Sequence, residues 1–371
     1  MAKYIAFRAD GSVDTGIGHI KRCLSLAQKF MREGFQVLFI SRSLTPVLEA
    51  EIKTSGADYI RIPTTSEREN RYFHSAWLNG TESDDASLSR EILVKYGCES
   101  NNELSLIVVD HYALGKPWET ELNSLAPLLV IDDLCDRSHH CNWLIDQTIG
   151  RQKGDYLALV NSDCQLLLGP QFSLLRDEFS QWRPKSLTRR KDIQHVNNIL
   201  VTLGGVDKNN KSLMTLSALE KSHYSGKITL IVGSGNPNLY SLEDAISKSL
   251  NKIRLVINSD KMSEEMTDAD LCIGAAGTTS WERCALGLPT INLVIAKNQE
   301  TIAKNLSQAG AAINFGLLEN EDDILRLKNL IDHLISDVTI LKKLSEASSQ
   351  VCDGTGLHRI YSTVNEKLCL M

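Results

Sequence analysis

The chain has 371 residues, 42% of them hydrophobic and 23% charged, and its 46 acidic and 40 basic side chains give a formal net charge of −6. This length exceeds what one hydrophobic core usually supports, so we expect two soluble domains. The acidic balance argues against nucleic acid or a membrane surface as a partner. Because no apolar run is long enough to span a membrane and the start lacks a signal-peptide pattern, we expect a cytoplasmic protein.

The first half alternates short apolar runs with helical patterns, which is typical of a parallel α/β sheet. A strand at 4–7 leads through the glycine-rich loop Gly16-Ile17-Gly18-His19 into a helix that ends at Gly34. Further strands are expected at 35–40, 59–62, 104–109, 128–131, 143–145 and 166–168, and further helices at 46–53, 86–95, 116–125 and 174–179. Residues 64–102 are polar and largely aperiodic, so we expect a surface insert there.

Three of these strands are each followed by acidic or amide side chains. The segments are Asp110-His111-Tyr112, Asp132-Asp133 and Asp146-Gln147. Because parallel strands end at the same edge of a sheet, we expect these side chains to gather there, where ligands bind. Helix capping and turn formation are the alternative explanation for such residues.

The second half begins a new series of strands and helices after a basic segment. Gln181 to Asp192 contains a proline and five basic residues, and we interpret it as a linker. Strands are expected at 198–203, 228–232, 253–257, 271–273, 291–296 and 311–315, and helices at 211–221, 239–249, 262–266, 301–309, within 322–349 and at 358–368. The sequence therefore predicts two doubly wound Rossmann-like domains facing across a cleft, 1–185 and 192–371, as in GT-B glycosyltransferases. The last helix has no strand to cover in its own domain and may return to the first.

The densest group of polar residues lies between residues 273 and 299. Gly277, Thr278, Thr279 and Ser280 join a strand to a helix, and backbone N–H groups and hydroxyls at such a position suit a phosphate. Glu282 lies one turn further along the same face, where its carboxylate would reach a ribose. Asn298 and Gln299 end the next strand. This stretch predicts a nucleotide site.

The cofactor and metal patterns in the chain are incomplete. Gly16-Ile17-Gly18 and Gly233-Ser234-Gly235 both lack the third glycine of a dinucleotide fingerprint, so we expect no cofactor. Asp268-Ala269-Asp270 spells a D-x-D pattern, but a turn before a buried strand is the favoured reading, and we expect no metal. The nine cysteines, without a C-x-x-C pair, indicate thiols in a reducing compartment; Cys135, His139, His140 and Cys141 match no common zinc spacing.

His19 is the best candidate for a general base. It stands directly after Gly18 at a helix start, where the helix dipole favours a neutral imidazole. A structural cap is the alternative role. Tyr112 and Asp110 would face the same site, with Tyr112 orienting the substrate by hydrogen bonds. A base in one domain and a nucleotide diphosphate in the other predict cleavage at a sugar's anomeric carbon, with water or a hydroxyl attacking.

These residues belong to a larger set of motifs that occur together and in order. The set comprises Gly16-Ile17-Gly18-His19 with Arg22, Asp110-His111-Tyr112, Asp132-Asp133, Gly169-Pro170 with Leu175-Arg176, Gly204-Gly205 with Asp207, Gly277-Thr278-Thr279, Trp281-Glu282, Asn298-Gln299, and Asp353-Gly354 with Arg359. It spans almost the whole chain and resembles the UDP-2,4-diacetamido-2,4,6-trideoxy-β-L-altropyranose hydrolases of pseudaminic acid biosynthesis, whose fold is similar to that of the MurG-like glycosyltransferases.

The resemblance implies a role for each matching residue. His19 would activate water, Tyr112 and Asn298 would position the sugar, Glu282 would hold the uridine ribose, and the turn from Gly277 to Ser280 would hold the diphosphate. We expect Asp10, Gly18, Arg22, Gly205 and Gln299 to be further substrate contacts. The reaction implied is inverting C–O cleavage by water, without a metal, that releases UDP. The chain departs from the family in its long polar insert between residues 62 and 104.

Three alternatives remain open from the sequence. A glycosyltransferase would use the same UDP-sugar with a hydroxyl acceptor, although the polar, acidic loop from Asp10 to Asp14 favours water. A hydrolysing 2-epimerase would need a carboxylate placed to abstract the proton at C2. A non-catalytic binder of nucleotide sugars would not need His19. The oligomeric state is not predicted.

Overall fold

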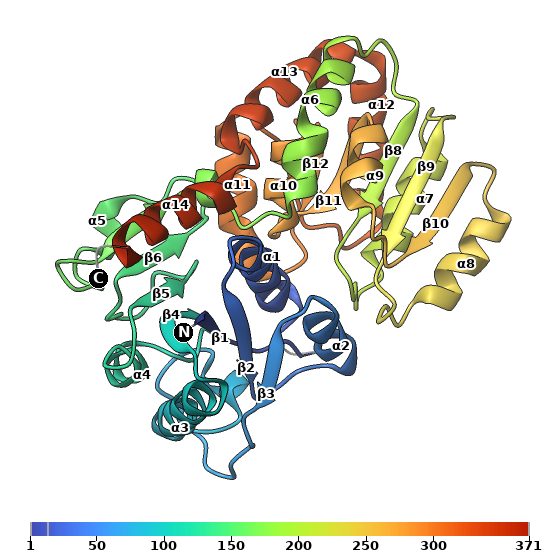
Figure 1. Cartoon of the computed structure of the whole chain (residues 1–371). Helices are drawn as coiled ribbons and strands as arrows, with labels where there is room; N and C mark the ends of the chain where they lie inside the picture. The colour runs from blue at the N-terminus through green and yellow to red at the C-terminus, as the bar shows by residue number, and fades with distance from the viewer. Residues whose placement is uncertain (1, 13–14, 370–371) are drawn as a thin grey trace. The chain divides into compact units, whose positions relative to one another are not determined.

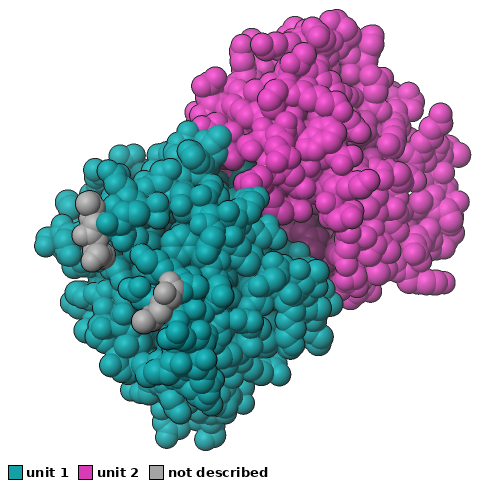
Figure 2. Space-filling model, in the orientation of Figure 1, with its two compact units in different colours: residues 1–175, 355–371 teal, residues 176–354 magenta. Residues whose placement is uncertain are grey.

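We describe the protein from a computed structural model, which covers residues 2–12 and 15–369, with the side chain of Asn298 outside the described part. The chain divides into two compact units, each with one parallel sheet and helices on both of its faces (Figure 1). Unit 1 comprises residues 1–175 and 355–371, and unit 2 comprises residues 176–354 (Figure 2). Val13 and Asp14 of the acidic loop lie outside the described residues.

Unit 1 contains a seven-stranded sheet in the order β3-β2-β1-β4-β5-β6-β7, and all neighbouring strands are parallel. The strands are β1 (Lys3–Ala9), β2 (Gln36–Ser41), β3 (Asp58–Arg61), β4 (Glu103–Asp110), β5 (Leu128–Ile131), β6 (Trp143–Asp146) and β7 (Gln165–Leu168). The helices are α1 (Gly18–Arg32), α2 (Pro46–Thr54), α3 (Glu82–Ser100), α4 (Lys116–Leu122), α5 (Lys153–Tyr156) and α14 (Gly356–Leu368), with 3-10 turns η1 (Ser75–Leu78) and η2 (Pro170–Phe172).

Alternate side chains of the central strands build two cores, one on each face of this sheet. Phe7 and Phe39 pack with α1, α2 and α14 on one face, while Ile107 and Val109 pack with α3 and α4 on the other. The expected insert therefore carries α3, a nineteen-residue helix that covers one face of the sheet. Its first turn holds Glu82, Asp84 and Asp85 under a Thr81 cap, which explains why a polar segment starts a helix there.

Unit 2 contains a six-stranded parallel sheet in the order β10-β9-β8-β11-β12-β13. The strands are β8 (Asn198–Thr202), β9 (Lys227–Val232), β10 (Lys252–Ile257), β11 (Leu271–Ala275), β12 (Thr290–Leu293) and β13 (Ile313–Gly316). The helices are α6 (Asp177–Lys191), α7 (Lys211–Lys221), α8 (Leu239–Lys248), α9 (Met262–Asp268), α10 (Thr279–Ala285), α11 (Glu300–Gln308), α12 (Glu321–Ser336) and α13 (Val338–Val351), with the 3-10 turn η3 (Lys297–Gln299). Two Rossmann-like units confirm the expected fold class.

The linker expected from Gln181 to Asp192 is wrong, because most of these residues form α6. The helix contains Pro184, and its arginines donate to backbone carbonyls of neighbouring segments. Arg190 is buried and donates to the carbonyls of Leu286, Ala269 and Met266. A basic composition therefore marks buried anchors in this segment. The division after Leu175 also lies before the expected domain end at residue 185.

The last helix, α14, belongs to unit 1, which is the placement that the sequence left open. Leu357, Ile360 and Val364 of this helix join the core that α1 covers. Gly356 begins α14 against Ser173, where an added Cβ would lie 2.3 Å from the Ser173 carbonyl oxygen. Within residues 2–12 and 15–369, no helix combines the length and apolar character needed to cross a membrane.

Candidate active site

The candidate catalytic residues lie where the strand order of unit 1 reverses. β2 lies on one side of β1 and β4 on the other. The chain therefore continues from β1 toward β2 and from β4 toward β5, in opposite directions across the sheet. The register pairs Ala9 with Asp110 at the carboxyl ends of β1 and β4. Open parallel sheets bind their ligands at such a switch point. His19 follows β1 at the start of α1, and Tyr112 follows β4.

His19 and Asp110 form a hydrogen-bonded pair. Nδ1 of His19 lies 2.6 Å from Oδ1 of Asp110, and the His19 residue is 9% exposed. An ionised carboxylate only accepts hydrogen bonds, so in the neutral imidazole Nδ1 carries the proton and Nε2 has the lone pair. This is the tautomer in which Nε2 can take a proton from water. The orienting group is therefore a carboxylate, which sequence reasoning had placed only in the same region.

Arg22 and Asp133 complete the surroundings of Asp110. Nε and Nη2 of Arg22 donate to the two oxygens of Asp110 over 2.6 and 2.7 Å, and Nη1 pairs with Asp133. Burial disfavours the charge on Asp110, but Arg22 and His19 outweigh it and hold the pKa of this carboxyl well below its usual range. The guanidinium of Arg22 binds these carboxylates and so supports the His19–Asp110 pair; its role as a substrate contact stays a prediction.

Tyr112 lies directly beside the candidate base. Its ring meets the His19 ring edge to face, with centroids 4.6 Å apart and planes at 82°. Its hydroxyl donates to Oδ2 of Asp133 over 3.1 Å. Burial and then the charge of Asp133 raise the pKa of Tyr112 well above its ordinary value, so the phenol stays neutral and can donate. The structure thus brings His19 and Tyr112 together with Asp133 at the strand ends, where the sequence predicted that these side chains would gather.

Asp10 lies in a buried network next to this site. It is 1% exposed, pairs with Arg8 over 2.7 Å and accepts from Nε2 of His111 over 3.1 Å. Arg42 donates its backbone N–H to the same carboxylate. These partners occupy both carboxylate oxygens, so Asp10 holds the end of β1 in place; its contact with the substrate stays a prediction. Arg8 also binds Asp85 of α3, which ties the insert to the same network.

In unit 2, the stretch that the sequence singled out lies at the corresponding reversal of strand order. β8 has β9 on one side and β11 on the other, and the turn from Gly277 to Ser280 follows β11. Thr278 is exposed and Thr279 half-buried. Ser280, by contrast, is buried, and its hydroxyl accepts from Nη2 of Arg283 over 2.9 Å. Of the three predicted hydroxyl groups, that of Ser280 faces the protein interior.

Arg283 holds this turn in its conformation through hydrogen bonds from its buried side chain. Its buried guanidinium also donates to the hydroxyl of Thr279, the carbonyl of Ala275 and the side-chain oxygen of Asn292. The α10 helix that begins at Thr279 has seven residues, so the turn depends on these side-chain bonds more than on helix length. Sequence reasoning missed Arg283, although an arginine four residues after a threonine is within hydrogen-bonding reach on a helix.

The remaining predicted contacts of unit 2 surround the same turn. Gln299 accepts from the backbone of Ile295 over 3.2 Å, and its Nε2 lies 3.6 Å from where a Cβ on Gly277 would stand. Glu282 is half-buried on α10, and the side chain of Asn298 lies outside the described part. Gly205 follows β8 and is exposed, and Gly233 packs so closely on it that an added Cβ would meet its carbonyl oxygen at 2.3 Å. Gly18 in unit 1, by contrast, has open space where a Cβ would stand.

The residues that suggested metal ligands have other partners. Asp270 accepts from Arg189 over 2.6 Å and from the backbone of Asn197 over 2.7 Å. His139 lies 2.7 Å from Glu119, and the Cys141 and Cys164 sulfur atoms are 3.6 Å apart. In the part of the chain that the structure describes, no three His, Cys, Asp or Glu side chains are grouped so as to hold a metal ion.

Two parallel-sheet units of this kind define the GT-B class of fold. Residues 198–355 match the glycosyltransferase family 28 C-terminal domain. The crystal structure of Acinetobacter baumannii MurG superposes with a TM-score of 0.69 over 99% of this chain and all of that chain, at 15% sequence identity. The likeness in fold to MurG-like glycosyltransferases is thus confirmed.

Curated relatives match over most of the chain. The UDP-2,4-diacetamido-2,4,6-trideoxy-beta-L-altropyranose hydrolase of Campylobacter jejuni is 25% identical over 84% of this chain and 98% of its own length. The spore coat polysaccharide biosynthesis protein SpsG of Bacillus subtilis is 22% identical over 98% of both. The resemblance to the hydrolase that the motifs indicated is confirmed by the first of these matches.

Proposed function

We propose that this protein is a metal-independent hydrolase that releases UDP from UDP-2,4-diacetamido-2,4,6-trideoxy-β-L-altropyranose in pseudaminic acid biosynthesis. The observation that carries the proposal is the His19–Asp110 pair, 2.6 Å apart at the switch point of unit 1, with Nε2 as the free base. The 25% identity to the Campylobacter jejuni hydrolase supports the choice of substrate. We infer a cytoplasmic location because nucleotide sugars are made there.

In this mechanism, Nε2 of His19 removes a proton from a water molecule as its oxygen attacks the anomeric carbon. The bond between that carbon and the diphosphate oxygen breaks, and the electron pair leaves with UDP. Attack from the side opposite UDP inverts the anomeric centre. Asp110 stabilises the imidazolium that forms, because its carboxylate already accepts from Nδ1. The products are UDP, the free sugar and one proton.

Unit 2 supplies the groups that suit UDP. Gly277, Thr278 and Thr279 offer backbone and hydroxyl donors to the diphosphate, and Arg283 holds their turn in shape. Glu282 binds the ribose, and Gln299 and Gly205 border the same turn. Ser280 is left out of the phosphate contacts because its hydroxyl is bound to Arg283. Tyr112 and Asn298 position the sugar.

Oxygen-18 water tests the reaction directly. We expect the protein to place one label in the released sugar and none in UDP, because water attacks carbon and the diphosphate keeps its oxygen. Label in UDP would show attack at phosphorus and contradict the proposal. Product NMR adds a second criterion, since a 2-epimerase would change the configuration at C2.

A glycosyltransferase reaction is the second candidate, favoured by the family 28 match over residues 198–355. It uses the same base and nucleotide groups, but a sugar or lipid hydroxyl takes the place of water. UDP release that depends on an added hydroxyl acceptor and ceases without one would support this candidate and contradict hydrolysis.

A further inference from the structure

Three aromatic rings form a cluster beside His19, and two of them come from the insert. The ring cluster consists of His74, Trp77 and Tyr112. The centroids of His74 and Trp77 are 4.2 Å apart, Trp77 and Tyr112 are 6.0 Å apart, and His74 and Tyr112 are 5.5 Å apart. Trp77 stands 6.4 Å from the His19 ring, nearly perpendicular to it. All three rings are half-buried, so each keeps part of its surface open to a ligand.

The segment that carries His74 and Trp77 is held rigidly in unit 1. Leu78, next to Trp77 in η1, is buried in the core that α3 and α4 cover. Asn79 binds Ser43 through its side chain over 3.0 Å, and its carbonyl accepts from Arg42 over 3.2 Å. The next residue, Gly80, has no room for a side chain, because an added Cβ would stand 2.0 Å from Nη1 of Arg42. The position of Trp77 is therefore fixed from its carboxyl side.

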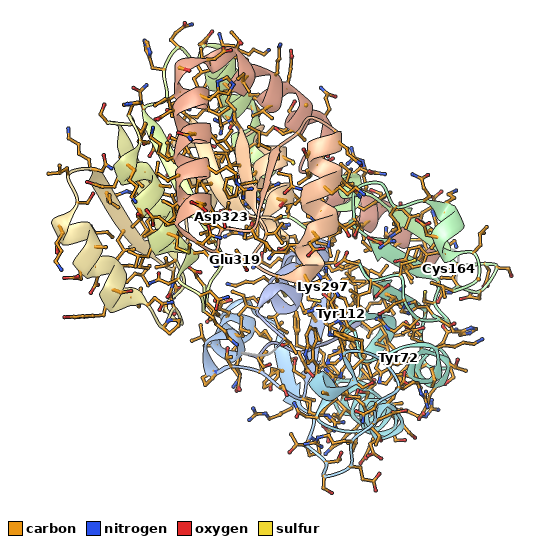
Figure 3. The ribbon with its side chains drawn as sticks, turned by 180° about the vertical axis from the view of Figure 1, so that it is seen from behind. Tyr72, Tyr112, Cys164, Lys297, Glu319 and Asp323 are labelled. Carbon is orange, nitrogen blue, oxygen red and sulfur yellow. The ribbon has the colours of Figure 1, made fainter. Side chains whose placement is uncertain are left out.

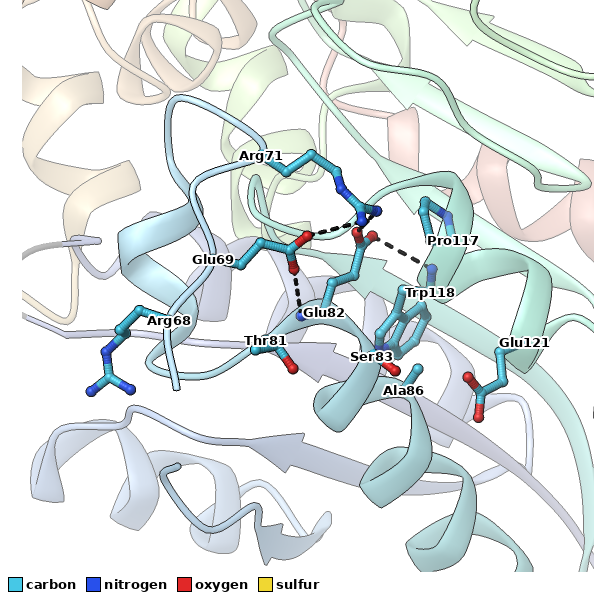
Figure 4. Close-up of a pocket in the computed structure, with 10 residues that line it drawn as sticks. All are labelled: Arg68, Glu69, Arg71, Thr81, Glu82, Ser83, Ala86, Pro117, Trp118 and Glu121. Atoms are coloured by element: carbon cyan, nitrogen blue, oxygen red, sulfur yellow. Dashed lines mark hydrogen bonds and ion pairs between the residues drawn. The ribbon is translucent and has the colours of Figure 1, made fainter. Parts of the chain in front are cut away.

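A second set of contacts holds the segment on the amino-terminal side of the ring cluster. Arg71 pairs with the buried carboxylate of Glu82 over 2.9 Å (Figure 4). Glu82 also accepts from the backbone N–H of Gly115 over 2.7 Å. Tyr72 packs against Gly115, where an added Cβ would meet its hydroxyl oxygen at 2.7 Å; Tyr72 and Tyr112 are labelled in Figure 3. These bonds border a pocket of about 390 Å³ lined by residues between 68 and 86 of the insert and by Pro117, Trp118 and Glu121.

The chemistry of the ring cluster favours an apolar ligand group. Burial lowers the pKa of His74, so its ring is neutral near pH 7 and presents an uncharged surface. Aromatic rings gain free energy by covering C–H groups, and ligand sites combine such apolar walls with a few polar groups. Here the polar groups are His19 and the Tyr112 hydroxyl. A sugar with its anomeric carbon near Nε2 of His19 would bring its ring substituents within reach of Trp77.

We propose that His74 and Trp77 of the insert form a subsite for the apolar substituents of the sugar, namely its acetamido methyl groups and the C6 methyl group. The subsite rests on the proposed function and deepens it, because it gives the insert a part in choosing the sugar. UDP-sugars with N-acyl and deoxy substituents gain contacts there, whereas fully hydroxylated sugars leave hydroxyl groups against an apolar wall. Trp77 is the main contact, because it is the larger ring and lies against both His74 and Tyr112.

The first experiment measures binding without turnover. In a His19→Ala background, calorimetry gives the affinities for UDP and for the intact UDP-diacetamido sugar. The ratio of the two isolates the contribution of the sugar. We expect Trp77→Ala to reduce this ratio by about 10- to 100-fold and to leave the affinity for UDP itself unchanged, the size expected for truncating an aromatic anchor. An unchanged ratio would overturn the subsite.

Matched variants separate this effect from damage to the fold. Trp77→Phe keeps a ring and should retain most of the ratio. Trp182→Ala removes a half-buried tryptophan of unit 2, whose ring lies 4.2 Å from Nζ of Lys185, and should leave the ratio unchanged. Loss of the ratio in Trp77→Phe as complete as in Trp77→Ala would contradict a contact through the ring face. Loss in all three variants would contradict a specific subsite.

Steady-state kinetics with His19 intact distinguish this inference from the proposed function. Trp77→Ala should raise KM for the diacetamido sugar by about 10- to 100-fold with little change in kcat, because the contact is present before the transition state. A natural chain that releases no UDP contradicts the proposed function, while a Trp77-dependent binding ratio would still support the subsite. Turnover with an unchanged KM in Trp77→Ala would overturn the subsite alone.

Discussion

At the scale of single residues, one carboxylate decides which nitrogen of His19 can act. Asp110 accepts from Nδ1 of His19. Arg22 donates two hydrogen bonds to Asp110, and its positive charge keeps the carboxylate ionised. A position at a helix start, which was the basis for the sequence prediction, would by itself favour a neutral ring. The observed pair adds an orienter that can stabilise the imidazolium when the proton arrives. The base is therefore both fixed in tautomer and prepared to accept charge.

Replacing His19 by alanine should remove the base and leave the nucleotide groups intact. We expect kcat to fall by about 10²- to 10⁴-fold, the usual contribution of general base catalysis, with no change in the affinity for UDP. Initial rates of UDP release and calorimetry with UDP measure the two quantities. His223→Ala is the control, because the His223 side chain is 82% exposed and lies in unit 2. Undiminished turnover in His19→Ala would contradict the assignment.

At the scale of elements, buried charges join segments that hydrophobic packing alone would not hold in register. Arg190 ties α6 to the carbonyls that follow α9 and α10, and Asp85 ties α3 to the end of β1. His139 does the same between α4 and β5, because it lies 2.7 Å from Glu119 and 3.7 Å from Asp132. The hydrogen bonds of Arg190, of Asp85 and of Nδ1 of His139 satisfy polar groups that would otherwise be buried without a partner.

Arg190→Met should destabilise unit 2 by about 1–3 kcal/mol, because the carbonyl of Met266 would lose its arginine donor, whereas Leu286 and Ala269 still accept from Ser186 and Arg189. Urea unfolding followed by fluorescence measures the change. Lys191→Met is the matched control, since Lys191 is exposed on the same helix and should change stability by less than about 0.5 kcal/mol. Equal stability of the two variants would mean that α6 is not anchored through Arg190.

The His139 cluster predicts a fall in stability at alkaline pH. Burial opposes the charge on His139, but Glu119 and Asp132 outweigh it and raise its pKa to about 9. A raised pKa stabilises the fold fully below the unfolded value of about 6.5, and this contribution is lost as the pH rises through about 9. The melting temperature should therefore decline over this range by more in the natural chain than in His139→Gln. Parallel declines would rule out this role.

At the scale of the whole molecule, the proposed mechanism predicts that the reaction does not need divalent ions. The carboxylate of Asp270 in the D-x-D pattern is bound to Arg189 and to backbone N–H groups. The proposed reaction uses only the base and the groups that bind the nucleotide. EDTA at about millimolar concentration should therefore leave UDP release unchanged. Inhibition that a divalent ion reverses would instead assign a metal to the reaction and direct attention to Asp268.

The sequence alone determined the features that depend on neighbours in the chain. The strands and helices were readable from local periodicity, and the glycine loops with His19 and Gly277 marked the ends of β1 and β11. The motif set also identified the resembling hydrolases. Helix α6 was misread because its basic residues look like a solvated linker until their carbonyl partners are known.

Only the tertiary structure decided which polar groups meet. Arg22 binds Asp110 and Asp133, which lie 88 and 111 positions away in the chain, and such distances leave no periodic signal. The same holds for Trp77, whose insert was predicted to be a polar, largely aperiodic surface segment but places a ring 6.4 Å from His19. Pairing across a sheet depends on how the strands are ordered, and a single sequence does not encode that order locally. The sequence thus pointed to His19 as the proposed base, and the fold decided which side chains contact it.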